Sequence, residues 1–470
     1  MTDGGPPRAV IIHGHFYQPP RDDPWLGTIP PEPSAAPYHD WNERIERECY
    51  APVLPSLVAL SFDFGPTLLA WMERAAPRTY AGVLEADRAS RARNGGNGGG
   101  GAIAMPYHHA ILPLCPRRDK ETEVRWGIAD FRRRFGREPE GMWLPETGVD
   151  DETLDVVAAE GIRFTVLAPH QVQRAPAGGR PGWYRTASGR RIALFPYDGP
   201  ASHDVAFGPA LGDAAAWAER LAAASSEVVA IATDGETFGH HHKGGAAALA
   251  QMLATLGGRR NVAIESFASF LATHPPAGDV GLVAPSSWSC PHGVERWRSE
   301  CGCRMHPERG MHQRWRAPLR AALDWLAAEL HGVYEREGGA LFRDPWAVRD
   351  AYGAVLGASP REITELLRRS MRRPEDQRAR ARAQELLELE RHALRMFTSC
   401  GWFFDDIAGL ESVIVLRSAA RAIELVGADG GAARLEGGLL ERLAAAPSND
   451  PAVGSGRELY LTRVKRSAAA

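Results

Sequence analysis

The chain has 470 residues, 44% of them hydrophobic, and a net charge of -3. This length exceeds one typical domain, so we expect a large first domain and a second, mainly helical one. The near-zero charge excludes a global field that attracts nucleic acid or an anionic membrane, so we predict neither as a partner.

Compartment signals are few. No apolar run of about 18 residues is present to span a membrane. The apolar run at residues 9–12 is too short for the core of a secretory signal. The six cysteines do not resemble a disulfide framework, which fits a reducing compartment. We therefore predict a cytoplasmic protein.

Short apolar runs alternate with helix-like segments through the first half of the chain. Each run stops at a polar or proline-containing turn before the next helical pattern begins. This alternation is typical of an α/β fold with a parallel sheet and helical crossovers. The runs are residues 9–12, 58–60, 102–104, 142–144, 192–195 and 228–232.

The clearest repeating unit covers residues 141–167. A strand at 142–144 is followed by a helix that Asp150 or Asp151 can cap and that extends to about Ala159. Gly161 fits the end of that helix, and the next strand is residues 163–167. Glu146 therefore follows the carboxyl end of a strand, the edge at which parallel α/β barrels place their chemistry.

The pattern changes after about residue 285. Helical spacing appears in residues 314–330, 359–371 and 374–396, and Ser359 begins a capping box with proline at the first helical position. We predict a barrel domain at 1–285, a helical domain at 286–447 that completes the active site, and a weakly ordered tail at 448–470. Residues 95–101 are predicted to be a flexible glycine-rich loop.

Three strand ends gather polar and aromatic residues. They are residues 13–20, 143–147 and 233–242. A barrel brings such segments to one mouth, where aromatic faces and polar groups suit sugar binding. His13 and His15 alternate on an extended segment and so share one face.

Glycoside cleavage needs two carboxylates on either side of the scissile bond. Glu146 and Asp234 come from separate strand ends, and Glu236 is the main competitor for the acid role, ranked below Asp234. The non-catalytic interpretations are that Glu146 is a charge at a helix N-terminus and that Asp234-Gly235 is an ordinary turn.

These segments resemble glycoside hydrolase family 57. His13-Gly14-His15 with Pro19 looks like the first motif of the family, and residues 141–146 look like its nucleophile motif. Residues 234–240 look like its acid/base motif. The resemblance covers about residues 8–275, and the remainder is similar to an uncharacterised subgroup of the family. The second motif has His108-His109 as its best candidate.

The resemblance implies a retaining enzyme acting on α-glucans, with Glu146 as nucleophile and Asp234 as general acid/base. It implies an incomplete seven-stranded (β/α) barrel with helical additions and no cofactor. Hydrolysis and transfer to another sugar use the same two carboxylates, so both stay open. The residues that we expect to bind substrate are His13, His15, Trp143, Glu236, His240, Trp288, His292, Arg296 and Trp402.

Two other functions compete with this one. A NodB-like metal-dependent deacetylase would build its site on a similar barrel and would use His13, His15, Asp234 and His240 as metal ligands. The other alternative is a non-catalytic glucan-binding protein on the same fold, although both carboxylates are present.

The cysteines of the second half form a separate question. Cys290, Cys301 and Cys303, with His292 or His306, could hold zinc. Structural zinc sites usually show paired short spacings, and only Cys301-Gly302-Cys303 is an obvious pair, so free thiols are favoured.

Overall fold

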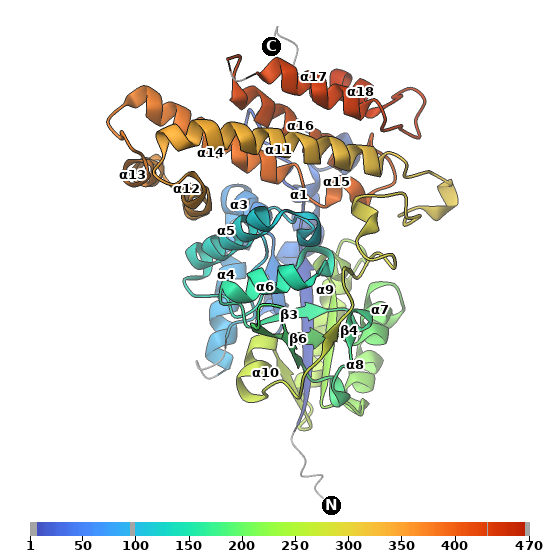
Figure 1. Ribbon diagram of the computed structural model, residues 1–470. Helices are drawn as coiled ribbons and strands as arrows, with labels where there is room; N and C mark the ends of the chain where they lie inside the picture. Colours follow the sequence, from blue (N-terminus) through green and yellow to red (C-terminus); the bar gives the residue numbers. More distant parts are fainter. Residues whose placement is uncertain (1–6, 95–98, 430, 466–470) are drawn as a thin grey trace, which may run out of the picture. The chain divides into compact units, whose positions relative to one another are not determined.

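The computed structural model describes residues 7–94, 99–429 and 431–465 (Figure 1). Contacts divide the chain into two compact units. The first unit is Met1–Gln18, Pro30–Pro106 and Phe131–Trp288, and the second is Pro19–Ile29, Tyr107–Asp130 and Ser289–Ala470. The division at residue 285 stays a prediction, but the contacts place two earlier segments with the C-terminal helices. Within the predicted loop at 95–101, residues 95–98 lie outside the described residues.

The first unit is built on parallel strands. β1 pairs in parallel with β2, β7 and β8, and β3 pairs in parallel with β6. The apolar residues of these strands are buried, as the central strands of a parallel sheet require, except in β8, whose residues are partly exposed. The bounds are β1 (Arg8–Phe16), β2 (Ser61–Phe64), β3 (Phe164–Leu167), β6 (Arg191–Pro196), β7 (Val228–Asp234) and β8 (Val262–Glu265).

Isolated parallel bridges continue the pairing between these strands. Phe62 pairs with Ala102, Ala104 with Met142, and Gly141 with Phe164. The predicted α/β class is therefore confirmed, whereas a seven-stranded barrel is not established by the pairing. The short antiparallel pieces are β4 (Val172–Gln173), β5 (Gly182–Arg185) and β9 (Gly281–Leu282).

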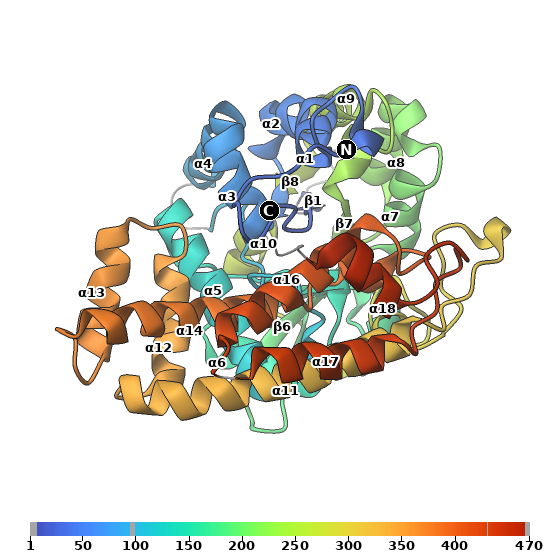
Figure 2. The same ribbon diagram turned by 90° about the horizontal axis from the view of Figure 1, so that it is seen from above.

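Helices surround the strands of the first unit in both views (Figures 1 and 2). The predicted helix after residue 150 is α6, with Asp150 as its N-cap accepting from the backbone N–H of Thr153 at 2.7 Å. Their bounds are α1 (Trp41–Ile45), α2 (Ala51–Leu57), α3 (Pro66–Ala75), α4 (Pro77–Arg93), α6 (Asp151–Ala159), α7 (Gly199–Ala206), α8 (Ala214–Ala223), α9 (Gly245–Gly257) and α10 (Phe267–Thr273).

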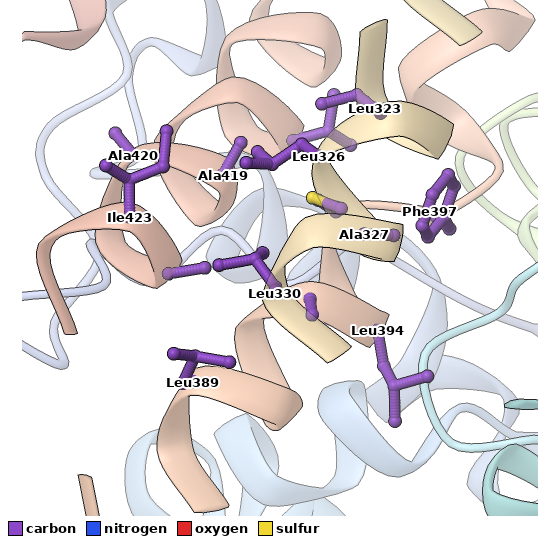
Figure 3. Packing of buried hydrophobic residues seen from close by; sticks show 14 of the residues in the cluster. Leu323, Leu326, Ala327, Leu330, Leu389, Leu394, Phe397, Ala419, Ala420 and Ile423 are labelled. Carbon is purple, nitrogen blue, oxygen red and sulfur yellow. The ribbon is translucent and has the colours of Figure 1, made fainter. Parts of the chain in front are cut away.

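The second unit is helical, as predicted. Its core packs α11, α14, α16 and α17 together, with Leu326, Leu330 and Leu389 among the buried side chains (Figure 3). The bounds are α5 (Arg117–Phe135, residues 117–130 of which belong here), α11 (Arg316–Leu341), α12 (Pro345–Tyr352), α13 (Pro360–Ser370), α14 (Gln377–Arg395), α15 (Cys400–Phe403), α16 (Leu410–Val426), α17 (Ala432–Leu443) and α18 (Gly456–Leu459).

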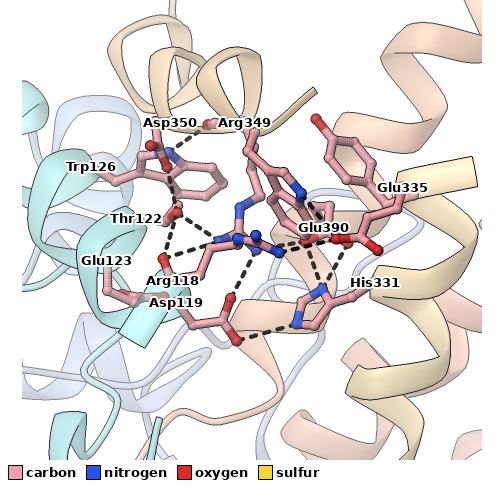
Figure 4. A network of polar contacts seen from close by, with 12 residues as sticks. Arg118, Asp119, Thr122, Glu123, Trp126, His331, Glu335, Arg349, Asp350 and Glu390 are labelled. Carbon is pink, nitrogen blue, oxygen red and sulfur yellow. Dashed lines mark hydrogen bonds and ion pairs between the residues drawn. The ribbon is translucent and has the colours of Figure 1, made fainter. Parts of the chain in front are cut away.

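A buried ion network joins four of these helices (Figure 4). The Arg349 guanidinium donates to Asp119 and to Glu390, each at 2.8 Å. The ring nitrogens of His331 lie 3.2 Å from Asp119 Oδ2 and 3.0 Å from Glu390 Oε2. The network thus satisfies charges that would be costly to bury alone.

Part of the predicted tail at 448–470 forms helical turns. α18 and the π-helical turn Tyr460–Val464 follow Ser455, whose side chain caps α18, and Leu459 and Tyr460 are buried. The weak order of the tail stays a prediction, but apolar side chains of residues 456–464 pack into the second unit. Among the described residues, no helix is both long and apolar enough to cross a membrane.

Candidate active site

Strand register brings the predicted polar segments together. In the parallel pairing of β1, His15 lies opposite Asp234 of β7 on one side and opposite Asp63 of β2 on the other. Because parallel strands end at the same edge of a sheet, the site collects at their carboxyl ends. His13 and His15 face the same way from β1, as predicted from their spacing.

Asp63 holds both histidines. Its two carboxylate oxygens lie 3.0 Å from His13 Nε2 and 2.8 Å from His15 Nδ1, and Ser61 Oγ lies 3.1 Å from His13 Nδ1. Burial opposes the charged form of both rings and lowers the pKa of His13. For His15 the Asp63 carboxylate outweighs burial and raises the pKa to about 9. His15 is therefore a cation at neutral pH.

Glu146 has an unusual backbone. Its φ is +56°, in the left-handed region that non-glycine residues seldom occupy and that costs about 1–3 kcal/mol. Trp288 fixes this turn twice: its backbone N–H donates to the Glu146 carbonyl at 3.1 Å, and its Nε1–H donates to Glu146 Oε2 at 3.0 Å. The strain and the two bonds hold one carboxylate oxygen in a defined place.

Asp234 is a carboxyl group that retains a large share of its protons at neutral pH. Burial is the largest cause that raises its pKa, to about 7. The charge of His15 acts in the opposite direction, while the nearby carboxylates of Glu236, Glu146 and Asp63 add to the increase. A carboxylic acid with a pKa near 7 suits general acid catalysis.

Glu236 leaves the strand and turns inward. β7 ends at Asp234, and a short 3-10 helix at Gly235–Phe238 begins there. Glu236 Oε1 accepts from the Tyr50 hydroxyl at 2.5 Å and from the Tyr17 backbone N–H at 3.2 Å. It is buried, and burial raises its pKa. With these partners Glu236 supports the turn and adds negative charge beside Asp234.

Gly235 is required by a close approach. A Cβ at this position would lie 2.2 Å from the Phe16 ring, which is closer than any real contact. The Phe16 ring stacks on Phe64 with centroids 4.4 Å apart and cannot easily move. The glycine after Asp234 thus reflects packing rather than the ordinary turn considered above.

His240 contacts a π-helical turn, Glu46–Tyr50, instead of the two carboxylates. Its Nδ1 lies 2.5 Å from Glu48 Oε2. Cys49 of the same turn donates through its thiol to the Gly235 carbonyl at 3.3 Å. Through Glu48, Cys49 and Tyr50, this turn therefore contacts the segment that follows Asp234 at three residues: His240, Gly235 and Glu236. π-Helical turns are often found at functional sites.

Trp143 packs against both histidines of the site. The rings of His13 and His15 stack on its indole at 4.8 Å and 5.1 Å, and Trp288 meets it edge-on at 5.1 Å. Trp143 is fully buried. The structure shows a packing role, and the predicted contact of this ring with sugar stays a prediction.

The remaining predicted residues lie in the second unit. Arg296 stacks on Phe403 and donates to its carbonyl, Trp402 is buried and donates to the Arg316 carbonyl at 3.2 Å, and His292 lies 3.8 Å from Cys303. Their contacts with substrate stay predictions. His108 and His109, the candidates for the second motif, pair with Glu123 and Ser399 of the same unit.

Sequence reasoning missed three residues. Asp63, Tyr50 and Tyr197 all act on the site: burial, then Asp234, raise the pKa of Tyr197 to about 12, and its ring lies 6.5 Å from Trp288. The signal for Asp63 was the alternation Ser61-Phe62-Asp63, which places two polar groups on the face that carries His13. No comparable signal marks Tyr50.

The site thus offers two carboxyl groups in different environments. Asp234 has a pKa of about 7 and is partly protonated at neutral pH, whereas Glu146 is aligned by an indole N–H and a strained turn. Such a pair can protonate a leaving oxygen and attack a cationic sugar carbon.

The family comparison covers the predicted motifs at residues 141–146 and 234–240, while the one at residues 13–19 lies outside the matched range. Residues 95–278 match glycosyl hydrolase family 57, and residues 311–470 match a domain of unknown function, DUF3536. The predicted family resemblance is therefore confirmed. An alpha-amylase of Pyrococcus horikoshii is 23% identical over 243 residues, half of this chain and 34% of that protein. The chain thus spans about a third of the length of this relative.

Solved structures share the fold at low identity. An exo-type maltose-forming amylase from Pyrococcus sp. ST04 has a TM-score of 0.74 at 16% identity, covering 93% of this chain and 83% of that one. The family 57-type branching enzyme of Pyrococcus horikoshii has a TM-score of 0.58 at 15% identity, covering 97% and 94%.

Proposed function

We propose that this family 57 chain is a retaining enzyme that cleaves or transfers α-glucosyl units of glucans or oligosaccharides. Glu146 is the nucleophile and Asp234 the general acid/base. The observation that carries the proposal is the contrast between an aligned Glu146 and an Asp234 whose pKa is about 7. The amylase and branching enzyme among the similar proteins support α-glucans as the substrate class.

The reaction follows from these two groups. Glu146 attacks the anomeric carbon while Asp234 gives its proton to the departing glycosidic oxygen, and a glycosyl-enzyme ester forms. Asp234, now ionised, takes a proton from water or from a sugar hydroxyl, which attacks the same carbon and releases Glu146. Water gives hydrolysis and a sugar gives transfer. The carboxyl groups should lie about 5–5.5 Å apart in a retaining enzyme.

The rest of the site supports the charges of this cycle. The imidazolium of His15 lies between Asp63 and the carboxyl of Asp234 and favours the ionised acid/base after proton donation. The strand pairings and bridges of the first unit are compatible with an incomplete seven-stranded barrel, which we adopt as its architecture. A cytoplasmic location is part of the proposal and rests on the sequence alone.

A metal-dependent deacetylase is less favoured. That reading needs a ring nitrogen of His13 as a ligand, but one nitrogen faces Asp63 and the other faces Ser61. Both ring nitrogens of His13 are thus already hydrogen-bonded within the protein, and neither is left to bind a metal. No specific observation favours this second function.

The test compares acid variants on substrates with different leaving groups. Asp234→Asn should slow glycosylation by roughly 10²–10⁴-fold on a maltooligosaccharide, but far less on aryl α-glucosides whose leaving groups need no proton. Glu146→Gln should form no covalent intermediate by mass spectrometry. The matched control is Glu236→Gln: leaving-group dependence there and not in Asp234→Asn would show that the acid is assigned wrongly. Product lengths and linkages from α-glucans then separate hydrolysis from transfer.

A further inference from the structure

Four potential metal ligands converge outside the catalytic pair. Cys290, His292, Cys301 and Cys303 each offer one atom, and these four atoms all lie within 4.8 Å of one another. Among the described residues, this is the group of three or more His, Cys, Asp or Glu side chains that converges in this way. All four residues belong to the second unit.

The distances fit a tetrahedral zinc site. The Sγ atom of Cys290 lies 3.9 Å from that of Cys301 and 3.7 Å from that of Cys303, and Cys303 Sγ lies 3.8 Å from His292 Nδ1. Tetrahedral bonds of about 2.3 Å to sulfur and about 2.0–2.1 Å to nitrogen place sulfur atoms about 3.8 Å apart and sulfur and nitrogen about 3.6 Å apart. A disulfide would need about 2.05 Å.

The backbone presents the ligands as two hooks. Cys290-Pro291-His292 and Cys301-Gly302-Cys303 each place two ligands one residue apart, so the chain does contain a second short spacing. Gly302 has a φ of +90°, a conformation that favours glycine and bends its hook. The first hook is hard to recognise in the sequence because its second ligand is a histidine and not a cysteine.

Two buried arginines, Arg296 and Arg316, donate to carbonyl groups, and Asp405 is the carboxylate whose charge acts on Arg316. The Arg316 guanidinium donates to the carbonyls of Cys303, Phe403 and Phe404 and lies 4.0 Å from Cys301 Sγ. Arg296 donates to the carbonyls of Phe403 and Ser289. Neither has a carboxylate within ion-pair distance among the described residues, although both are buried. Buried cations without a counter-charge are costly.

We propose that Cys290, His292, Cys301 and Cys303 bind one structural Zn²⁺. On binding, three thiols release three protons to solvent and neutral His292 supplies the fourth ligand, so the site carries one net negative charge. That charge lies beside the Arg316 guanidinium and provides a counter-charge closer than that of Asp405. With four protein ligands the site is closed, which is typical of structural rather than catalytic zinc.

The metal would fix a segment that has little regular secondary structure. Residues 298–315 precede α11 and contain one short 3-10 turn, Pro307–Arg309. Asp405 holds part of it by accepting from the backbone N–H groups of Met305 and His306, each at 2.7 Å. Zinc ties the two hooks together and closes the intervening turn at residues 293–300. This gives His292 a ligand role in place of the predicted sugar contact, independently of the proposed function.

The test measures metal in the full-length protein. After expression with added zinc and gel filtration, elemental analysis should find about one Zn²⁺ per chain. Replacement by Co²⁺ should give the intense visible bands of a tetrahedral site with thiolate charge transfer. Removing zinc with a chelator should lower the melting temperature by several degrees, and added Zn²⁺ should restore it.

Matched variants locate the site. Cys303→Ser and His292→Ala should lose most of the zinc, whereas Cys115→Ser and His306→Ala, which change the same residue types outside the cluster, should keep it. If the first pair fails to fold, reconstitution of the chelated wild-type protein decides. Wild-type protein that holds less than about a tenth of an equivalent with zinc present, or that carries a native disulfide between two of these cysteines, overturns the proposal.

Discussion

At the residue scale, the proton on Asp234 is set by opposing charges. Burial and the neighbouring carboxylates favour the protonated acid, and the His15 imidazolium favours the ionised one. The same neighbours make this pKa adjustable by single substitutions. The net shift, from 3.8 to about 7, also means that Asp234 lowers the stability of the folded protein progressively as the pH rises from 3.8 to about 7, and that this cost is complete above pH 7.

The pH dependence of activity should therefore follow Asp234. On substrates that need acid assistance, kcat/KM should fall roughly tenfold per pH unit above about pH 7, because the acid loses its proton. Glu236→Gln removes a negative neighbour and should shift this alkaline limb down by roughly one unit, whereas His15→Gln removes a positive one and should shift it up. Shifts of the same sign in both variants would contradict this electrostatic account.

Trp288 should matter through its hydrogen bond as well as its ring. Trp288→Phe keeps an aromatic side chain and the backbone bond to Glu146 but removes the 3.0 Å Nε1–H···Oε2 bond. We expect kcat to fall by about 10–100-fold with little change in melting temperature, since the nucleophile is no longer aligned. Trp183→Phe, the same change on β5, is the control. Equal activity of the two variants would exclude an aligning role for the bond.

The sequence pointed to the proposed catalytic pair but not to the residues that contact it. Glu146 and Asp234 follow recognisable strands, so their strand-end positions could be predicted from local patterns alone. Asp63 could not, because its role depends on register: it matters only once His13 and His15 are seen opposite Ser61 and Asp63. The left-handed φ of Glu146 was equally invisible, since neither proline nor glycine forces it.

At the element scale, helix ends were predictable and helix partners were not. Asp150 and Ser359 cap α6 and α13 as their local sequences indicate, because capping is a short-range interaction. The ion network of α5, α11, α12 and α14 joins residues more than 200 positions apart, such as Arg349 and Asp119. The local sequence of either helix does not indicate which helix it pairs with.

This network should stabilise the second unit strongly. Arg349→Met leaves Asp119 and Glu390 buried with one cation fewer and should cost about 3–5 kcal/mol in unfolding free energy, measured by denaturant. The control Arg368→Met breaks an exposed pair on α13 and should leave the midpoint nearly unchanged. Equal losses in the two variants would show that burial does not decide the contribution.

The pH dependence of that stability has a defined sign. Burial lowers the pKa of His331, but Glu390 and Asp119 outweigh it and raise the pKa to about 10, above the unfolded value of 6.5. Its contribution is complete below pH 6.5 and is lost as the pH rises through 10. For Asp119 burial opposes ionisation, yet His331 and Arg349 lower the pKa to about 2, so its contribution is lost as the pH falls through 2.

At the scale of the whole molecule, the two units are interleaved in sequence. The second unit takes residues 19–29 and 107–130 from within the first half of the chain. Tyr107, Ile111 and Trp126 from these residues are buried in the core that α11, α14 and α16 build, and Trp126 donates to the Arg349 carbonyl. Composition and periodicity changed only near residue 285, so sequence reasoning placed one boundary where the structure has several crossings.

A chain cut after residue 288 should therefore not fold on its own. It would expose Tyr107, Ile111 and Trp126, and each large apolar side chain contributes roughly 1.5–3 kcal/mol when buried, against a total stability of about 5–15 kcal/mol for a typical domain. Residues 1–288 expressed alone should appear in aggregates or lack a cooperative thermal transition. Expressed together with residues 289–470 as a separate chain, they should recover solubility, because the second chain restores the cover of this core.

A monomeric fragment 1–288 with a sharp melt by circular dichroism would refute the argument. Loss of activity on truncation is thus expected from folding alone, so a direct contact of the C-terminal half with substrate must be tested by point substitutions in the intact chain.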